Sequence, residues 1–303
     1  MAMPETTWTL AAPFALTGRG LHGNKPCSVT VSPAECGGLR FIHAPSGTHI
    51  PATEGFVGDL SLATTLVKGD ARLQTVEHVL SALYGLGVAH ALIEVDGEEL
   101  PILDGSSAPW AEAVGRVGLR ALGVAPRRLK VLRKVSVRDG QRHISISPSD
   151  RLRLSYSIDF PGTSIGRQSL SLNVTPESYR RELASARAFC LKREIDYMRS
   201  RGLALGGSLD NAVVYDENGH MNGSLRFKDE AVRHKLLDLV GDLALIGMPL
   251  LGHVEAHAAG HALHVSLAKR LLDDVGAWTV DGVPPARAPQ VYGPDLVHGL
   301  AAV

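Results

Sequence analysis

Val232-Arg-His-Lys-Leu-Leu-Asp238 lies in a segment whose apolar residues recur at helical spacing. The segment opens on Asp229-Glu230 and stops before Gly247, so the sequence predicts one helix over residues 229–246. Its apolar positions are Leu236, Leu237, Val240, Leu243 and Ile246. Such a helix buries its apolar face, so the polar residues within it need a separate explanation.

The polar residues His234, Asp238 and Asp242 are spaced four apart, so they lie above one another on one face of this helix. On a helix otherwise rich in leucine and valine, they either face solvent or converge on a group that satisfies them. Exposure is the ordinary outcome for charged side chains. The alternative is a metal site to which His234 and Asp238 contribute two ligands.

The tetrapeptide Thr75-Val-Glu-His78 opens a second predicted helix, with Thr75 as its N-cap and Tyr84 near its end. Glu77 and His78 fall in the first turn, which is either solvated or points at a site. With His78 as the third ligand, the chain has the set that a catalytic zinc takes while it keeps a fourth position for water. Glu77 is then a candidate base for that water, whose pKa falls to about 7 on zinc.

A further histidine lies in Gly260-His-Ala-Leu263, between a predicted strand over residues 250–256 and a predicted helix that runs to Leu272. A histidine at such an element edge is well placed for proton transfer near neutral pH. If Asp242 reaches His261, its carboxylate raises the pKa of the imidazole and holds the protonated form. The alternative is a surface histidine, one of 13 in the chain.

These motifs occur with others in the order of a known family. They are Thr17-Gly-Arg-Gly-Leu-His22, Thr75-Val-Glu-His78, Pro101-Ile-Leu-Asp-Gly-Ser106, Leu205-Gly-Gly-Ser208, Leu225-Arg-Phe227, Val232-Arg-His-Lys235 and Gly260-His-Ala-Leu263. Over residues 8–275 the chain resembles the UDP-3-O-acyl-N-acetylglucosamine deacetylases, zinc enzymes of lipid A biosynthesis in Gram-negative bacteria. The resemblance makes a solvated role for the polar motifs untenable.

By position, the resemblance implies that His78, His234 and Asp238 bind zinc. It also implies that Glu77 activates the attacking water. It also implies that His261 is catalytic and that Asp242 is the acid beside it. Two histidines and one aspartate match the ligand set of non-haem iron(II) as well. The sequence therefore leaves Fe2+ open beside Zn2+.

The resemblance also implies substrate contacts. It assigns Lys235 to the substrate, Phe189 to the lining of the sugar and acyl region, and residues 191–208 to an insert that forms a hydrophobic acyl passage. The predicted contacts within that insert are Leu191, Ile195, Met198, Leu203, Ala204, Gly207 and Ser208. An apolar passage suits an acyl chain because each buried methylene contributes about 0.8 kcal/mol.

One position departs from the family pattern. The family usually has a threonine between the residues that match Arg187 and Phe189, whereas this chain has Ala188. In the family that hydroxyl helps to hold the developing oxyanion, and loss of one such donor typically costs about 100-fold to 1000-fold in turnover. Ala188 predicts a slower enzyme, a substitute group at the site, or a paralogue that acts on another amide.

The implied reaction is hydrolysis of the N-acetyl group of UDP-3-O-(3-hydroxyacyl)-N-acetylglucosamine, an early committed step of lipid A biosynthesis. It yields acetate and UDP-3-O-(3-hydroxyacyl)-glucosamine. The alternatives are a divergent paralogue that hydrolyses another N-acyl sugar or amide, and a zinc-binding protein without turnover. A metallopeptidase is disfavoured because the chain lacks a His-Glu-x-x-His motif.

Composition bounds the compartment and the partners. The chain has 31 Lys and Arg against 31 Asp and Glu, so no net charge favours nucleic acid or an anionic membrane surface. Its three cysteines lack paired spacing, which favours a reducing compartment. No stretch resembles a signal peptide or reaches the roughly 18 apolar residues of a membrane span. We expect a cytoplasmic monomer that binds a UDP-linked sugar, binds no nucleic acid and is not an integral membrane protein.

The order of predicted elements repeats along the chain. In the first half they are strands at 27–31, 38–43 and 90–95, with helices at 75–84 and after residue 107. In the second half they are strands at 129–137, 143–147, 152–159, 169–174 and 250–256, with helices at 176–187, 191–200, 229–246 and after residue 261. The repeat predicts an α+β fold of two similar domains, each a β-sheet layered against helices, with the metal site at their interface. We place the domains at residues 1–125 and 126–275, followed by an irregular proline-containing tail at 276–303.

Overall fold

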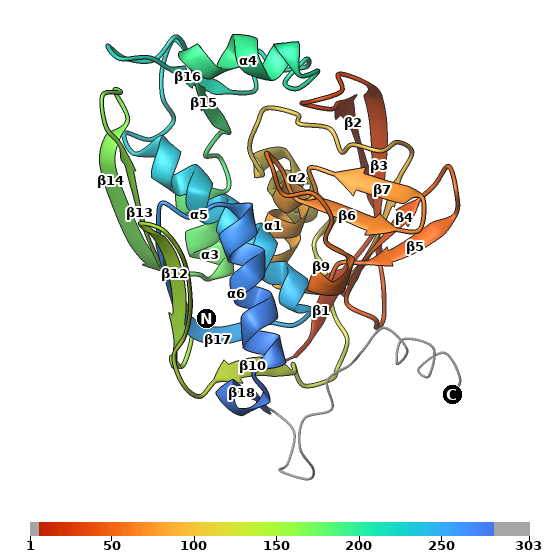
Figure 1. The fold of residues 1–303 in the computed structure, drawn as a ribbon. Helices are drawn as coiled ribbons and strands as arrows, with labels where there is room; N and C mark the ends of the chain where they lie inside the picture. The colour runs from red at the N-terminus through yellow and green to blue at the C-terminus, as the bar shows by residue number, and fades with distance from the viewer. Residues whose placement is uncertain (1–5, 282–303) are drawn as a thin grey trace.

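The computed structural model describes residues 6–281 and has an α+β fold built around two seven-stranded sheets. The sheets form the outer layers, and helices α1, α5 and α6 lie between them (Figure 1). The helices are α1 (Glu77–Gly85), α2 (Ala108–Val117), α3 (Pro176–Ser178), α4 (Ile195–Ser200), α5 (Glu230–Leu243) and α6 (His261–Asp273). The predicted architecture of two similar sheet-and-helix layers is confirmed.

Each half of the chain contributes one of the large sheets. The strands of the first sheet are β1 (Trp8–Leu10), β2 (Phe14–Arg19), β3 (Pro26–Pro33), β4 (Leu39–His43), β5 (Thr48–Pro51), β8 (Val88–Val95) and β9 (Leu119–Ala121). The strands of the second are β10 (Arg128–Val131), β11 (Val135–Asp139), β12 (Arg142–Ser147), β13 (Leu152–Phe160), β14 (Gly166–Asn173), β17 (Leu250–His257) and β18 (Trp278–Asp281). Two small sheets pair β6 (Thr65–Lys68) with β7 (Ala71–Gln74) and β15 (Phe189–Leu191) with β16 (Val213–Tyr215).

The two large sheets share one strand order. In the first, β8 pairs in parallel with β1 and β4 and antiparallel with β3. In the second, β17 pairs in parallel with β10 and β13 and antiparallel with β12. Helix α1 precedes β8 along the chain, just as α5 precedes β17. The two helices are therefore equivalent by position, and they face each other between the sheets.

The crossing of α1 and α5 is unusually close at Gly241. A Cβ atom at this position would overlap the carbonyl oxygen of Glu77 and would lie 2.9 Å from its carbonyl carbon. Only glycine permits this approach, because the obstructing atoms belong to backbone rather than to a flexible side chain. The absence of a side chain at Gly241 thus brings the first turn of α1 against the last turn of α5.

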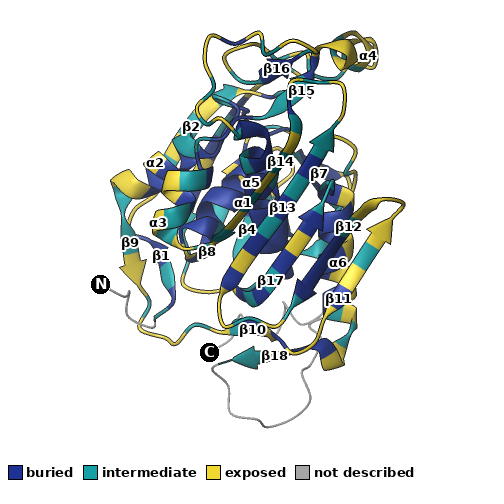
Figure 2. Cartoon of the chain, turned by 90° about the vertical axis from the view of Figure 1, so that its left-hand side faces the viewer, coloured by how far each residue is buried: buried dark blue, intermediate teal, exposed yellow. Residues whose placement is uncertain are grey.

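Burial follows the layered arrangement. Figure 2 shows buried residues in the central helices and alternating burial along the strands of the second sheet. On β13, Leu154, Tyr156 and Ile158 point inward and are at most 2% exposed, whereas the residues between them are half-buried. This period of two is the pattern of a sheet with one face on the core. The helices between the sheets are consequently shielded from solvent on both sides.

The structure corrects several predicted elements. The single strand predicted over residues 129–137 is two strands, β10 and β11, which belong to different parts of the second sheet. The helix predicted over 176–187 ends earlier, since α3 continues only as a π-helix to Leu183. The helix predicted over 191–200 is a 3₁₀-helix over Lys192–Glu194 that continues into α4. These segments mix helical and strand signals over few residues, where periodicity discriminates poorly.

The predicted tail also differs. Trp278–Asp281 form β18, which pairs antiparallel with β10, so these four residues are not irregular as predicted. Residues 282–303 of the predicted tail lie outside the described residues. The predicted domain boundary falls in the connection between β9 and β10. The boundary between residues 125 and 126 stays a prediction.

Candidate metal centre and catalytic site

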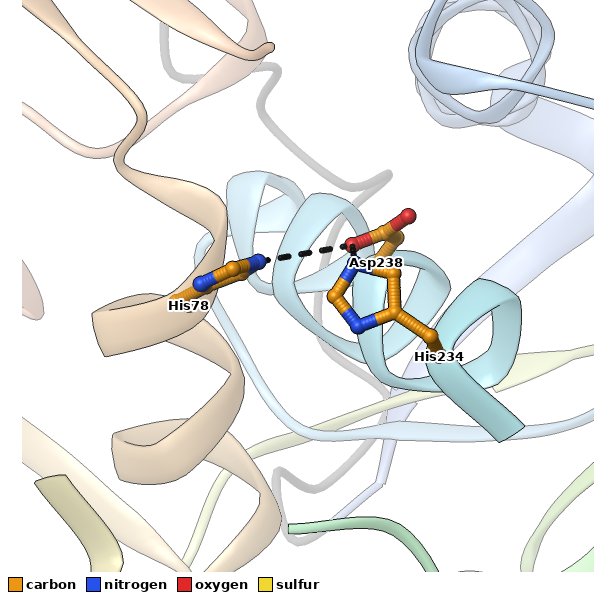
Figure 3. A group of neighbouring side chains, drawn as sticks. All are labelled: His78, His234 and Asp238. Atoms are coloured by element: carbon orange, nitrogen blue, oxygen red, sulfur yellow. Dashed lines mark ion pairs between the residues drawn. The ribbon is translucent and has the colours of Figure 1, made fainter. Parts of the chain in front are cut away.

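Three buried side chains converge where α1 meets α5. His78 comes from the first turn of α1, and His234 and Asp238 come from successive turns of α5, as Figure 3 shows. The Oδ1 atom of Asp238 lies 3.2 Å from Nε2 of His234 and 3.8 Å from Nε2 of His78. One potential ligand atom from each residue lies within 4.8 Å of the others. This spacing suits three ligands around one metal ion.

The surroundings orient two of these side chains. Nδ1 of His234 lies 3.0 Å from the carbonyl oxygen of Ala186. A carbonyl can only accept, so we assign the proton to Nδ1, which leaves the lone pair of Nε2 for a metal. The Nζ atom of Lys235 donates to Oδ2 of Asp238 at 2.9 Å, which leaves Oδ1 facing the histidines. Each residue thus presents one lone pair to the shared centre.

Charge and burial match these orientations. Burial lowers the pKa of His78 to about 3, and it also lowers the pKa of His234, so both imidazoles are neutral and able to bind a metal. Burial opposes ionisation of Asp238, but His234 and Lys235 hold its pKa well below the ordinary range. Burial alone would lower the pKa of Lys235, yet Asp238 beside it raises that pKa. The protonation states are those that a cation requires.

Glu77 lies next to this centre and is 4% exposed. Its Oε2 atom accepts a hydrogen bond from the backbone N–H of Thr64 at 3.0 Å, and its Oε1 atom lies 4.0 Å from Nε2 of His261. Burial raises the pKa of Glu77 to about 7. A carboxylate with such a pKa can take up and release a proton near neutral pH.

His261 lies at the first position of α6, and Asp242 reaches it as the sequence suggested. Nδ1 of His261 is 2.7 Å from Oδ2 of Asp242. Burial would lower the pKa of His261, but Asp242 raises it to about 9, and the same ion pair lowers the pKa of buried Asp242 to about 2. His261 is therefore a cation at neutral pH, with Nε2–H turned toward Glu77.

Two further residues complete this network and were missed by sequence reasoning. Nδ1 of His264 lies 2.8 Å from Oδ2 of Asp242, and Oγ1 of Thr64 donates to Oδ1 of the same carboxylate at 2.6 Å. His264 falls three positions after His261, so helical spacing on α6 could have indicated it. Thr64 carries no such signal, because it is 178 residues away from Asp242 in the chain.

A buried ion pair holds the segment that leads into the site. Nε of Arg187 donates to Oε1 of Glu230 at 2.8 Å, and the backbone N–H groups of Arg187 and Arg226 bond the same carboxylate. Glu230 is fully buried on the first turn of α5. The pair fixes the chain just before Ala188 and Phe189, which then reach the site beside His234.

A cavity of about 370 Å³ opens beside the candidate ligands. Most of its lining is apolar, and it includes Glu77, His78, His234, Asp238, His261 and Ala188. The predicted substrate-contacting residues that line it are Lys235, Phe189, Ile195, Met198, Ala204, Gly207 and Ser208. Leu191 and Leu203 are not among its described lining residues; Leu191 instead lines a separate hollow with Tyr215. Leu191 ends β15 and is buried, so its contact with the substrate stays a prediction.

The predicted N-cap is also different in the structure. Val76 caps α1, and Thr75 adopts a φ of 61°, a left-handed conformation that is rare for a β-branched residue. Its buried hydroxyl has no hydrogen-bond partner within residues 6–281. Thr75 lines the cavity next to Glu77 and His78.

Comparison with known proteins gives a consistent picture. A family model described as LpxC, UDP-3-O-acyl N-acetylglycosamine deacetylase, matches residues 7–273. A UDP-3-O-acyl-N-acetylglucosamine deacetylase of Anaeromyxobacter sp. (strain Fw109-5) is 41% identical over 292 residues, which cover 94% of this chain and 96% of the relative. Enzymes of the same name from Anaeromyxobacter dehalogenans (strain 2CP-C) and Myxococcus xanthus (strain DK1622) are 43% and 40% identical, over 90% and 97% of this chain and 89% and 94% of the respective relatives.

Proposed function

Because the chain belongs to the UDP-3-O-acyl-N-acetylglucosamine deacetylase family, we propose that it removes the acetyl group of UDP-3-O-(3-hydroxyacyl)-N-acetylglucosamine by hydrolysis. The products are acetate and UDP-3-O-(3-hydroxyacyl)-glucosamine, and the reaction serves lipid A biosynthesis. The observation that carries the proposal is the convergence of His78, His234 and Asp238 beside a buried base and an apolar cavity.

Zinc is the metal that we propose for this site. The donor set fits it, since the two imidazole nitrogens are neutral and accessible and the carboxylate is ionised. Bound zinc would supply Lewis acidity toward the amide carbonyl and lower the pKa of a water. The same donors suit Fe2+, so the metal content of the purified protein decides between the ions.

Glu77 is the proposed general base. Its Oε1 atom is not bonded to Thr64 and faces the cavity side of the site, where it can take the proton of the attacking water. Its raised pKa of about 7 makes the carboxylate a stronger base than an exposed glutamate.

His261 is the proposed acid and electrostatic partner. Asp242 keeps it protonated, so a positive charge and the Nε2–H donor are directed at the region where charge develops on the amide oxygen. The same proton can pass to the departing amine. Glu77 and His261 therefore divide the proton transfers between base and acid.

The cavity supports the substrate assignment. We propose that Lys235 and Phe189 contact the sugar region, since both line the cavity beside the candidate ligands and Nζ of Lys235 lies 5.8 Å from the centre of the Phe189 ring. The predicted acyl passage runs along Ile195, Ala204 and Gly207, which line the same cavity. A place for Leu191 in that passage stays a prediction.

Compartment and assembly complete the proposal. In the described chain no helix is long and apolar enough to cross a membrane. All three cysteines are free thiols, which supports the cytoplasm as the compartment. A monomer without affinity for nucleic acid stays our prediction.

Ala188 favours a second candidate, a paralogue that hydrolyses another N-acyl sugar or amide. The side chain lines the cavity but offers no hydroxyl where the family pattern has a threonine. Mass spectrometry of the products formed by the zinc-loaded protein from UDP-3-O-(3-hydroxyacyl)-N-acetylglucosamine separates the two candidates. If the substrate loses its acetyl group with the intact protein but not with the Glu77→Ala variant, the result supports the deacetylase. Absence of turnover by folded, metal-replete protein favours the paralogue.

A further inference from the structure

Thr64 contacts the proposed base Glu77 and also the pair formed by the proposed acid His261 and Asp242. Its backbone N–H donates to Oε2 of Glu77 at 3.0 Å, and its hydroxyl donates to Oδ1 of Asp242 at 2.6 Å. The same hydroxyl oxygen lies 3.1 Å from Nδ1 of His261. Thr64 is 0% exposed, so water does not compete for these contacts.

The two carboxylates use their oxygens in the same way. Each binds Thr64 through one oxygen and turns the other toward His261. Oε1 of Glu77 lies 4.0 Å from Nε2 of His261, and Oδ2 of Asp242 lies 2.7 Å from Nδ1 of that ring. Thr64 therefore holds the oxygen of each carboxylate that faces away from the imidazole, while Oδ2 of Asp242 also lies 2.8 Å from Nδ1 of His264.

The backbone around Thr64 is itself held. Its carbonyl oxygen accepts a hydrogen bond from the N–H of Val76 at 3.3 Å, just before α1 begins. The next residue, Thr65, starts β6 and donates its N–H to the carbonyl oxygen of Asp59 at 3.2 Å. Thr64 thus belongs to the half of the chain that carries Glu77, while its hydroxyl reaches the half that carries Asp242 and His261.

We infer that Thr64 is a positioning residue for the deacetylation, which sets the distance between the general base Glu77 and the acid His261 by holding the non-reacting oxygen of each carboxylate. The inference rests on the proposed function. Loss of the hydroxyl leaves Oδ1 of buried Asp242 without its donor, so that His261 and His264 hold this carboxylate through Oδ2 alone, whereas the backbone contact to Glu77 stays. The pair then loses its alignment while the ligands of the metal keep theirs.

The test compares Thr64→Val, Thr64→Ala and Thr64→Ser with the control Thr65→Val. Thr65 is also 0% exposed, but its hydroxyl has no hydrogen-bond partner within the described residues, so the control removes a buried hydroxyl of the same kind next door. We expect Thr64→Val and Thr64→Ala to lower kcat by about 10-fold to 100-fold with KM changed less than about 2-fold, because a misplaced catalytic group costs turnover rather than ground-state binding. Thr64→Ser should recover most of the loss.

A second measurement does not depend on turnover. The imidazole ¹⁵N and Nδ1 proton signals of His261, assigned with His261→Gln, should shift in Thr64→Val and Thr64→Ala and stay in place in Thr65→Val. Metal content should equal that of the unchanged protein in all four variants. Either hydroxyl-free variant suffices if the other does not fold.

The outcomes separate the two claims. An active unchanged protein in which Thr64→Val matches Thr65→Val in kcat and in the His261 signals overturns the positioning role. If the unchanged protein is inactive, the proposed function is wrong. The His261 signals alone then decide whether Thr64 positions Glu77 and His261.

Discussion

Helices α1 and α5 occupy equivalent places in two sheets of the same strand order, yet they supply different chemistry. Helix α1 contributes a base and one candidate ligand from its first turn, whereas α5 contributes two candidate ligands and Asp242 from three successive turns. A repeated scaffold thus provides two opposed helices, and unlike sequences on them make one asymmetric site. Neither half has the ligand set without the other.

The two helices also differ in how their polar groups are satisfied. Asp238 and Asp242 lie on a buried helix and find partners on α1, on α6 and in the Thr64 segment. Buried carboxylates without such partners would be strongly destabilising. The polar stripe on α5 is therefore explained only by the other elements of the fold, and the following predictions separate the contributions of the two helices.

Loss of a ligand from either helix should have the largest effect. We expect His78→Ala on α1 and Asp238→Ala on α5 to lose metal alike, by more than the 10-fold to 100-fold that removal of a merely orienting partner typically costs. Metal analysis after dialysis measures the loss, with Lys269→Ala on the exposed side of α6 as a control. Full metal retention in either variant would contradict a shared site.

The base should break the equivalence of the two helices. Glu77→Gln keeps the size of the side chain and the three candidate ligands, so metal content should stay unchanged while kcat falls by about 100-fold to 10,000-fold. Steady-state kinetics beside metal analysis gives both numbers. Equal loss of metal and activity would make Glu77 a ligand rather than a base.

The close helix crossing can be broken at Gly241. Gly241→Ala places a Cβ against the Glu77 backbone, and we expect it to lower the free energy of unfolding by about 1–3 kcal/mol through overpacking. The matched control is Gly115→Ala on α2, where no atom lies within 4 Å of the added Cβ and helix propensity favours alanine by about 0.5–1 kcal/mol. Denaturant unfolding measures both variants. A neutral Gly241→Ala would show that the helices can separate freely.

The base on α1 and the acid on α6 should give a bell-shaped pH profile. Turnover needs Glu77 ionised and His261 protonated, so kcat/KM should fall as pH drops below about 7 and as pH rises above about 9. A bound cation lowers the pKa of Glu77 and moves the acidic limb to lower pH. His261→Gln should remove the basic limb, and its persistence in that variant would exclude His261 as the acid.

Ala188 offers the smallest change. Its methyl group lines the cavity, and Ala188→Thr restores the family's hydroxyl there. We expect kcat to rise by about 10-fold, less than the 100-fold to 1000-fold cost of losing a preorganised donor, because the surroundings of this chain did not form around a threonine. A fall in kcat would indicate that another group already holds the oxyanion or that the substrate differs.

Helical spacing predicted part of this site. His234, Asp238 and Asp242 are one stripe on α5, and the structure buries all three as the metal interpretation required. The repeated order of elements along the chain was also visible in the sequence, whereas the order of strands within each sheet was not predicted. Both patterns could be read from the sequence because they extend over many residues.

Other features depend on contacts that no local pattern contains. Thr64 meets Asp242 only because the halves pack together, and Gly241 matters only because α1 crosses α5 at that point. Thr75 was expected to cap α1 with its hydroxyl. Its backbone is instead left-handed, and Val76 is the N-cap.

The central claim is that α1 and α5 together hold one metal ion, and anomalous diffraction from crystals grown with one equivalent of zinc tests it most directly. We predict a single anomalous peak about 2.0–2.2 Å from Nε2 of His78, Nε2 of His234 and an oxygen of Asp238. A peak on the other cluster of potential ligands, Asp242, His261 and His264, or on the residues of α5 alone, would contradict the account.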